Sequence, residues 1–141
     1  PPRSTLFPYT TLFRSAFRYI KQLNLSVWIL FKNGAVLCCH HNDTNINSEL
    51  ISAFFTALQN FSEEYGDGPL QAIMLKEFQY MFFSKHPHLI TLICRAPSQF
   101  DYDELHPFLA QIYEEFWGRF EPILNESFEG YVGPFQNFFS S

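Results

Sequence analysis

Residues 26–37 read SVWILFKNGAVL, and this stretch decides the predicted fold. Asn33 and Gly34 both tolerate a positive φ, so the pair favours the type I′ turn of a two-residue β-hairpin. Residues 27–31 are apolar at every position, as in a central strand that is covered on at least part of both faces. The sequence therefore predicts two strands, residues 27–31 and 35–39, joined by a tight turn.

A one-sided apolar pattern after the hairpin predicts a helix over residues 48–65. Its apolar residues are one, three and four positions apart, which places them on one helical face: Leu50, Ile51, Phe54, Phe55, Leu58 and Phe61. Asn47 is suited to cap this helix at its N-terminus, and Gly66 is suited to end it. We expect the apolar face to belong to the core.

The next stretch, residues 70–95, carries many β-forming residues and no helical pattern. This predicts three strands, and their connections are short enough for an antiparallel meander. The first break falls near residues 76–77, and residues 85–88 form the turn between the last two strands.

A second helical pattern runs over residues 105–123, and its second proline, Pro122, should kink or end the helix. After Gly133 and Pro134, the spacing of three further phenylalanines predicts the opening of a third helix: Phe135, Phe138 and Phe139. The chain is therefore expected to end in helices that pack on the sheet.

The composition limits the class of protein. A chain of 141 residues is long enough for one domain whose core needs no disulfide or metal. An excess of 14 acidic over 9 basic residues disfavours nucleic acid as a partner. No apolar run approaches the roughly 18 residues of a membrane helix. We therefore expect no nucleic-acid binding and no membrane-spanning helix.

The N-terminal segment has an unusual feature. Residues 5–15 read TLFPYTTLFRS, which on back-translation resembles a common short-read sequencing adapter, in frame. We therefore expect residues 1–15 to be a non-native, adapter-derived segment and residues 16–141 to form a single domain. The abrupt ending in Phe139, Ser140 and Ser141 suggests that this domain is truncated at its C-terminus.

One cluster contains residue types that bind metals: Cys38, Cys39, His40 and His41. On a strand, successive side chains point to opposite faces, so positions 38 and 40 would share one face and positions 39 and 41 the other. A four-ligand zinc site would need further donors, for which His86 and His88 are candidates. The spacing matches no zinc template, so we expect buried cysteines and strand-end histidines without a metal.

No other pattern in the chain indicates catalysis. The three cysteines do not form a disulfide framework and suit a reducing compartment, the cytoplasm. A nucleophilic pair of Cys94 with His40 is conceivable, but nothing in the sequence activates the thiol. Nucleotide-binding, zinc-protease and hydrolase motifs are absent. We therefore expect no catalytic residue, no cofactor and no enzyme activity.

The aromatic residues of the meander are the candidate partner-binding residues. Most of the 18 phenylalanines fall at core positions of the predicted helices. Phe78, Tyr80 and Phe82 instead follow one another on a predicted strand. If this strand lies at an edge of the sheet, its aromatic side chains are suited to contact a partner protein.

The predicted order of elements is hairpin, helix, three-strand meander and C-terminal helices. This is an α+β fold with helices on a five-stranded antiparallel sheet. It resembles the longin-like and roadblock superfamily. The resemblance is carried by residues 26–37 and by residues 49–61, ELISAFFTALQNF, whose spacing of aliphatic, Phe, Ala and Phe positions is typical of small longin-like proteins. Phe116 and the later Gly133-x-Phe135 fit the same pattern.

The superfamily has two variants that differ at the ends of the domain. Longin-like domains begin at the first strand and end in two helices, which is the order expected here. Roadblock domains place a helix before the first strand and usually end with a single helix. Residues 16–24 have an apolar spacing of three that suits such a helix, so the roadblock variant remains the alternative.

The resemblance implies a non-enzymatic interaction module. Members of the superfamily bind small GTPases, coat or tethering subunits or SNARE segments, and they often dimerise. The resemblance therefore implies a cytoplasmic protein that regulates or scaffolds a small GTPase or a vesicle-trafficking complex and contacts membranes only through partner proteins. The expected partner is a small GTPase or an assembly subunit, and a homodimer is one expected assembly. Two alternatives stay open: a roadblock-type GTPase regulator and dimerisation platform, and a small-ligand sensor on a profilin-like or PAS-like sheet.

Overall fold

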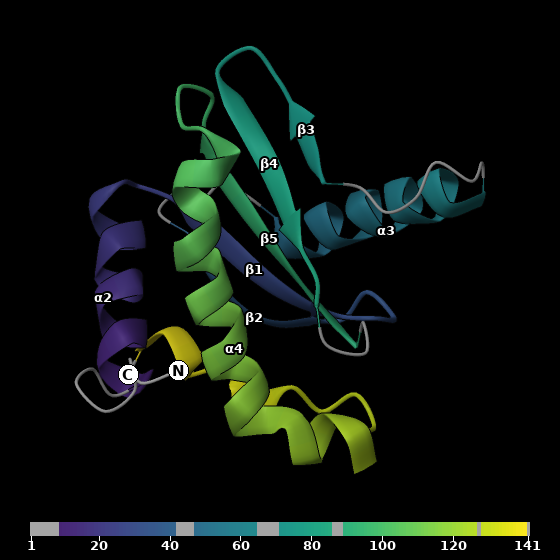
Figure 1. Ribbon diagram of the computed structural model, residues 1–141. Helices are drawn as coiled ribbons and strands as arrows, with labels where there is room; N and C mark the ends of the chain where they lie inside the picture. The colour runs from purple at the N-terminus through teal and green to yellow at the C-terminus, as the bar shows by residue number, and fades with distance from the viewer. Residues whose placement is uncertain (1–8, 42–46, 65–70, 86–88, 127, 141) are drawn as a thin grey trace.

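The computed structural model describes residues 9–41, 47–64, 71–85, 89–126 and 128–140. Along the chain, a helix is followed by a hairpin, a second helix, three strands, a third helix and two short 3-10 turns (Figure 1). The strands form one sheet with helices on both faces. The predicted α+β class is confirmed.

The five strands are antiparallel to their neighbours and lie in the order β2-β1-β5-β4-β3. Their bounds are β1 Ser26–Phe31, β2 Val36–His40, β3 Ala72–Met74, β4 Phe78–Phe83 and β5 Ile90–Pro97. β5 pairs with β1, so the last strand of the meander occupies the middle of the sheet. β2 and β3 are therefore the edge strands, and β4 lies one strand inside.

The turn between β1 and β2 differs from the predicted type I′ turn. The Phe31 N–H donates to the Ala35 carbonyl at 2.8 Å, which leaves three residues in the loop. Gly34 has a φ of +94°, whereas Asn33 has no positive φ. A type I turn closed by a left-handed glycine therefore replaces the two-residue turn, since it needs only one residue in that conformation.

Helices cover both faces of the sheet (Figure 1). α2 (Tyr9–Gln22) and α4 (Tyr102–Glu126) lie on one face, and α3 (Ser48–Glu64) lies on the other. The main core forms between α2, α4 and the sheet. A smaller core lies under α3 and contains Trp28, Leu30, Phe55, Phe82 and Ile93. β1 therefore buries side chains on both faces, as its continuous apolar run predicts.

A helix, α2, precedes β1 in the structure. Ala16, Phe17 and Ile20 are buried in the main core, so the spacing at residues 16–24 marks a true helix face. The helix begins at Tyr9, inside the segment that the sequence predicts to be adapter-derived, and the origin of residues 1–15 stays a prediction. None of the described helices is long and apolar enough to cross a membrane.

The C-terminal region differs in part from the prediction. α4 continues through Pro122, and Figure 1 shows its last turns bent away from the axis of the rest, as expected where a ring replaces the backbone donor. The predicted third α-helix is wrong. Two 3-10 turns, η1 Gly133–Phe135 and η2 Phe138–Ser140, stand in its place. Such tight turns allow three phenylalanines to enter the main core: Phe135, Phe138 and Phe139.

Candidate functional site

The three aromatic residues predicted to bind a partner lie on β4, but their surroundings differ. Phe82 is 5% exposed and meets the ring of Phe55 edge to face at 5.0 Å. Tyr80 is half-buried, with its ring centroid 5.4 Å from that of Phe55. Phe78 is half-buried and lies 3.6 Å under the guanidinium of Arg95. Phe82 is therefore a packing residue of the smaller core, whereas Phe78 and Tyr80 keep accessible surface.

Large apolar side chains are also exposed on the outer side of α3 and at the end of the edge strand β3. Met74 aligns with Gln79 and therefore lies on the other face of the sheet from α3. We call these five exposed residues together the α3–β3 surface: Leu50, Phe54, Phe61, Met74 and Leu75. Their exposed fractions run from 54% to 70%, so they contribute little to either core. Exposed apolar surface of this kind is typical of protein-interaction sites.

The sequence pattern missed this surface because the apolar face of α3 is broader than one contact requires. Ile51, Phe55 and Leu58 pack toward the sheet, and the other three apolar residues of the helix point outward. At the helical repeat of 3.6 residues per turn, the six apolar positions spread over roughly 140°. The width of the stripe was the signal for a second contact surface.

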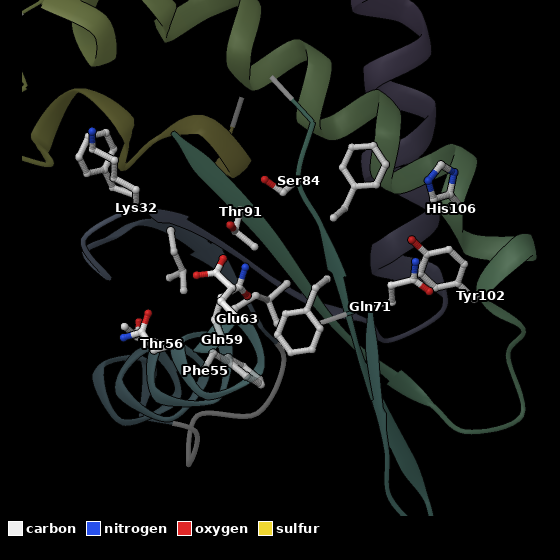
Figure 2. Close-up of a pocket in the computed structure, with 16 residues that line it drawn as sticks. Lys32, Phe55, Thr56, Gln59, Glu63, Gln71, Ser84, Thr91, Tyr102 and His106 are labelled. Atoms are coloured by element: carbon white, nitrogen blue, oxygen red, sulfur yellow. The ribbon is translucent and has the colours of Figure 1, made fainter. Parts of the chain in front are cut away.

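A cleft of about 630 Å³ opens between α3 and the sheet (Figure 2). Apolar residues of the smaller core form its floor: Leu30, Phe55, Phe82 and Ile93. Its rim is mostly polar and includes Lys32, Thr56, Gln59, Glu63, Gln71, Ser84 and Thr91. Tyr102 and His106 of α4 also line the cleft. An apolar floor with a polar rim is suited to bind a small molecule.

The cysteine and histidine side chains at residues 38–41 alternate between the two faces of the sheet, as expected along a strand. Cys38 lies in the main core, and the ring of His40 meets that of Phe17 at 5.6 Å. Cys39 and His41 lie on the α3 side. Within the described residues, no group of three or more His, Cys, Asp or Glu side chains is placed to hold a metal ion. The two further histidines proposed as donors, at positions 86 and 88, lie outside those residues.

The structure does not bring Cys94 and His40 together as a nucleophilic pair. Both align with Val27 of β1, one from each neighbouring strand, which separates their backbones by about 10 Å. Complete burial raises the pKa of the Cys94 thiol to about 12. The thiol is therefore protonated near neutral pH and is not a reactive nucleophile.

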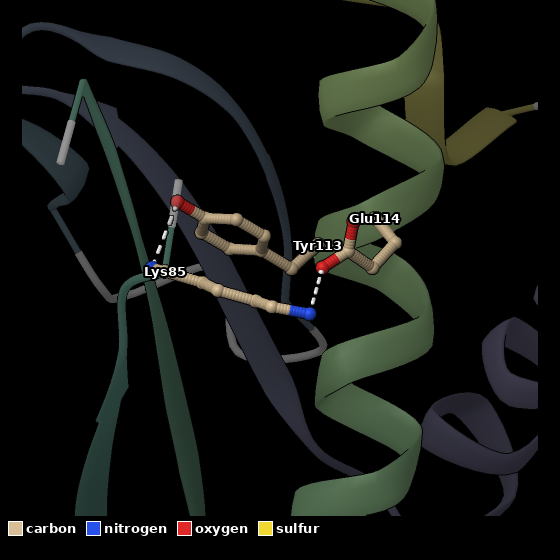
Figure 3. A network of polar contacts seen from close by, with 3 residues as sticks. All are labelled: Lys85, Tyr113 and Glu114. Atoms are coloured by element: carbon tan, nitrogen blue, oxygen red, sulfur yellow. Dashed lines mark hydrogen bonds and ion pairs between the residues drawn. The ribbon is translucent and has the colours of Figure 1, made fainter. Parts of the chain in front are cut away.

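A polar network fixes α4 to the end of the β4–β5 pair (Figure 3). The Lys85 Nζ lies 2.9 Å from the Glu114 Oε2. The Tyr113 hydroxyl accepts a hydrogen bond of 3.1 Å from the Lys85 N–H and donates one of 3.2 Å to the Ile90 carbonyl. The ion pair and the two hydrogen bonds of Tyr113 join α4 to β4 and β5, so the network contributes to the packing of α4 on the sheet.

Comparison with solved structures identifies proteins of the same architecture. Myxococcus xanthus MglB aligns with a TM-score of 0.59 at 15% identity, over 82% of this chain and 98% of that chain. A Roadblock/LC7 domain from Streptomyces avermitilis aligns with a TM-score of 0.52 at 19% identity, over 70% of this chain and 83% of that chain. The chain has a longin-like/roadblock fold.

In this chain a helix lies before β1 and one long α-helix follows β5. No protein-family model matches the sequence, and no curated protein matches it. At the identities found for the two solved structures, the likeness concerns the fold, and function has to be argued from the surface.

Proposed function

We propose that this chain is a non-enzymatic interaction module of the roadblock type that self-associates and regulates or scaffolds a small GTPase. The α3–β3 surface carries the proposal. Among the described residues, seven large apolar side chains are exposed, and five of them belong to this surface. The other two, Tyr19 and Tyr131, are aromatic residues with a polar hydroxyl.

Two features of the α3–β3 surface favour association with a second copy. Among the described strands, β3 pairs with β4 alone, so its outer edge is suited to present backbone donors and acceptors to a further strand. The exposed side chains of α3 offer an apolar helix face as a second contact. Fully burying one such side chain contributes about 1.5 to 3 kcal/mol, which is ample for a stable contact when several are buried together.

Light scattering over a dilution series tests the self-association. We expect a dimer for the unmodified chain and a monomer for Phe54→Asp and Phe61→Asp, because a carboxylate on the α3–β3 surface would have to be buried without a partner charge. Tyr131→Asp is the matched control, since Tyr131 is 78% exposed and lies outside the surface. A monomer at every concentration of the unmodified chain would contradict the proposal.

The GTPase part of the proposal rests on the roadblock resemblance. We propose on this basis that the chain acts in the cytoplasm on a vesicle-trafficking or comparable complex and reaches membranes only through partners. The test is binding to a panel of small GTPases, each loaded with GDP or with a non-hydrolysable GTP analogue. Nucleotide-dependent binding is expected for at least one of them. Absence of binding by both the dimer and the monomeric Phe54→Asp variant would contradict this part.

A small-ligand sensor is the second candidate, and the cleft under α3 favours it. An apolar floor with a polar rim suits a small molecule with an apolar body. Ligand-observed nuclear magnetic resonance with a set of aromatic fragments tests this candidate on the unmodified chain and on Gln59→Trp, which fills the cleft. Fragment binding that Gln59→Trp abolishes would support the sensor, and equal binding to both proteins would exclude it.

A further inference from the structure

The part of the sheet that carries Phe78 and Tyr80 also carries an arginine on the central strand. Arg95 of β5 aligns with Tyr80 of β4 on one side and with Ser26 of β1 on the other. Directly opposed residues of antiparallel strands share a face, so these three side chains form a row across the sheet. Two residues further along these strands, and on the same face, Trp28 and Ile93 are buried in the smaller core. The row of Arg95 therefore lies at the margin of that core.

The guanidinium of Arg95 is held in a defined position but lacks an anionic partner in the described part of the chain. It stacks on the ring of Phe78 at 3.6 Å, the distance of a close cation–π contact. By contrast, Arg119 forms an ion pair of 2.8 Å with Glu115. Arg95 is half-buried in a chain of net charge −5, so its lack of a carboxylate is not due to a shortage of acidic residues.

We propose that Arg95, with Phe78 and Tyr80 beside it, binds a single Asp or Glu side chain on an acidic–apolar segment of a partner protein. Stacking on Phe78 fixes the plane of the guanidinium and leaves its edge donors for a carboxylate, which they fit in bidentate geometry. The flanking rings supply apolar contact for a neighbouring aliphatic residue of the segment. One cation in an acidic chain suits one carboxylate and disfavours a polyanion.

This inference rests on the proposed function as an interaction module, and it assigns the chemistry of a partner contact to residues other than those of the α3–β3 surface. Four arginines of the described chain provide an internal comparison in one spectrum: Arg14, Arg18, Arg95 and Arg119. Arg18 is exposed on α2, on the opposite side of the sheet, and Arg119 is already paired. Their side-chain Nε resonances can be followed together.

The test is a titration of ¹⁵N-labelled protein with the acetylated, amidated peptide ALELA, and with ALQLA as the uncharged match. We expect the Arg95 Nε resonance to shift and saturate with millimolar ALELA, with no response to ALQLA. Arg95→Gln should weaken binding by about tenfold or more, and Arg95→Lys should restore only part of it because ammonium lacks the planar fork. Arg119→Gln is the matched control and should bind as the unmodified chain does.

Three outcomes overturn the inference. The first is a shift at Arg95 no larger than that at Arg18. The second is equal response to both peptides. The third is an Arg95 resonance that moves with protein concentration in the absence of peptide, which would assign the site to a second copy.

If Arg95→Gln does not fold, Phe78→Leu replaces it, since it removes the stacking ring and keeps an apolar side chain. Loss of peptide binding with an unchanged dimer separates this site from the self-association surface.

Discussion

The side-chain amide of Gln136 donates a hydrogen bond of 2.7 Å to the backbone carbonyl of Leu37, which lies 99 residues earlier in the chain. Leu37 belongs to the edge strand β2, at the point where the register with β1 shifts between Ile29 and Leu30. A bulge of this kind leaves backbone groups without a partner on the neighbouring strand. Gln136 therefore supplies a donor to an edge that the sheet leaves open and ties the C-terminal segment to β2.

Replacing Gln136 with alanine should lower the free energy of unfolding by about 1 kcal/mol, the usual net value of one hydrogen bond. Urea denaturation followed by tryptophan fluorescence measures the change. Gln99→Ala is the matched control, because Gln99 is exposed and lies outside the C-terminal segment. Equal midpoints for the two variants would show that the contact with Leu37 contributes nothing to stability.

Gly34 and Gly118 should respond in opposite directions to alanine. Gly34→Ala forces a Cβ into a residue with φ of +94° and within 3.1 Å of the Thr56 Oγ1, so we expect a loss of about 1 to 2 kcal/mol. Gly118→Ala has no atom to meet within 4 Å and lies in α4, where alanine is the better helix former by up to about 1 kcal/mol. Thermal unfolding of both variants measures these changes in stability. A Gly34→Ala variant more stable than the unmodified chain would contradict the turn geometry.

His40 should make the stability of the chain depend on pH. Burial, and then the positive charges of Lys21 and His41, lower the pKa of His40 in the folded state. The unfolded state therefore binds more protons in acid. The stabilisation of the folded state by neutral His40 is complete above its ordinary pKa of about 6.5. This stabilisation is lost as the pH falls through the lower folded-state pKa.

His40→Gln should accordingly lose less stability than the unmodified chain between neutral pH and about pH 5, where an ordinary histidine is protonated. Guanidinium denaturation at a series of pH values provides the free energies of unfolding. His41→Gln serves as the comparison on the other face of the sheet. Parallel pH curves for the unmodified chain and His40→Gln would rule out this role.

The three cysteines should differ strongly in reactivity toward a thiol reagent at mildly alkaline pH. Burial raises the pKa of Cys38 well above its ordinary value, with a smaller effect of Cys39, and raises that of Cys94 to about 12. Cys39 is half-buried, so we expect one fast-reacting thiol in the folded chain, removed by Cys39→Ser. Fast labelling of Cys94 in the folded chain, identified by peptide mass analysis, would contradict its burial.

Replacing Phe82 or Phe78 with alanine should have different effects on stability, because Phe82 is a core residue and Phe78 is proposed to contact a partner. Phe82→Ala removes a ring from the smaller core and should cost about 3 to 4 kcal/mol. Phe78→Ala removes a half-buried ring and should cost clearly less, while weakening the peptide contact proposed for Arg95. Denaturation midpoints of the two variants measure the difference. A core-sized loss for Phe78→Ala would identify it as a packing residue as well.

The local elements of the fold were predictable because each is encoded within a short window. The apolar run before Gly34 predicted β1, and the spacing from Leu50 to Phe61 predicted α3 to within one residue at its C-terminus. Alternation along β2 also placed Cys38 and Cys39 on opposite faces. These signals depend on neighbours in the chain, so no long-range contact was needed to find them.

The candidate site was only partly predictable. Sequence alone selected Phe78, Tyr80 and Phe82 as a set, but which of them α3 covers depends on where that helix crosses the sheet. Arg95 was not selected at all. Its position beside Tyr80 follows from the pairing of β4 with β5, and its stacking on Phe78 is a contact between residues 17 positions apart in the chain.

The sequence by itself determined the strands, the helices α3 and α4 and the α+β class, since apolar periodicity and turn residues act over a few positions. Only the tertiary structure decided the form of the C-terminal segment, the outward face of α3 and the partners of Arg95. Each of these depends on which apolar side chains find a surface to pack against. That choice is made by contacts between distant segments, such as Gln136 with Leu37, and a local pattern does not contain it.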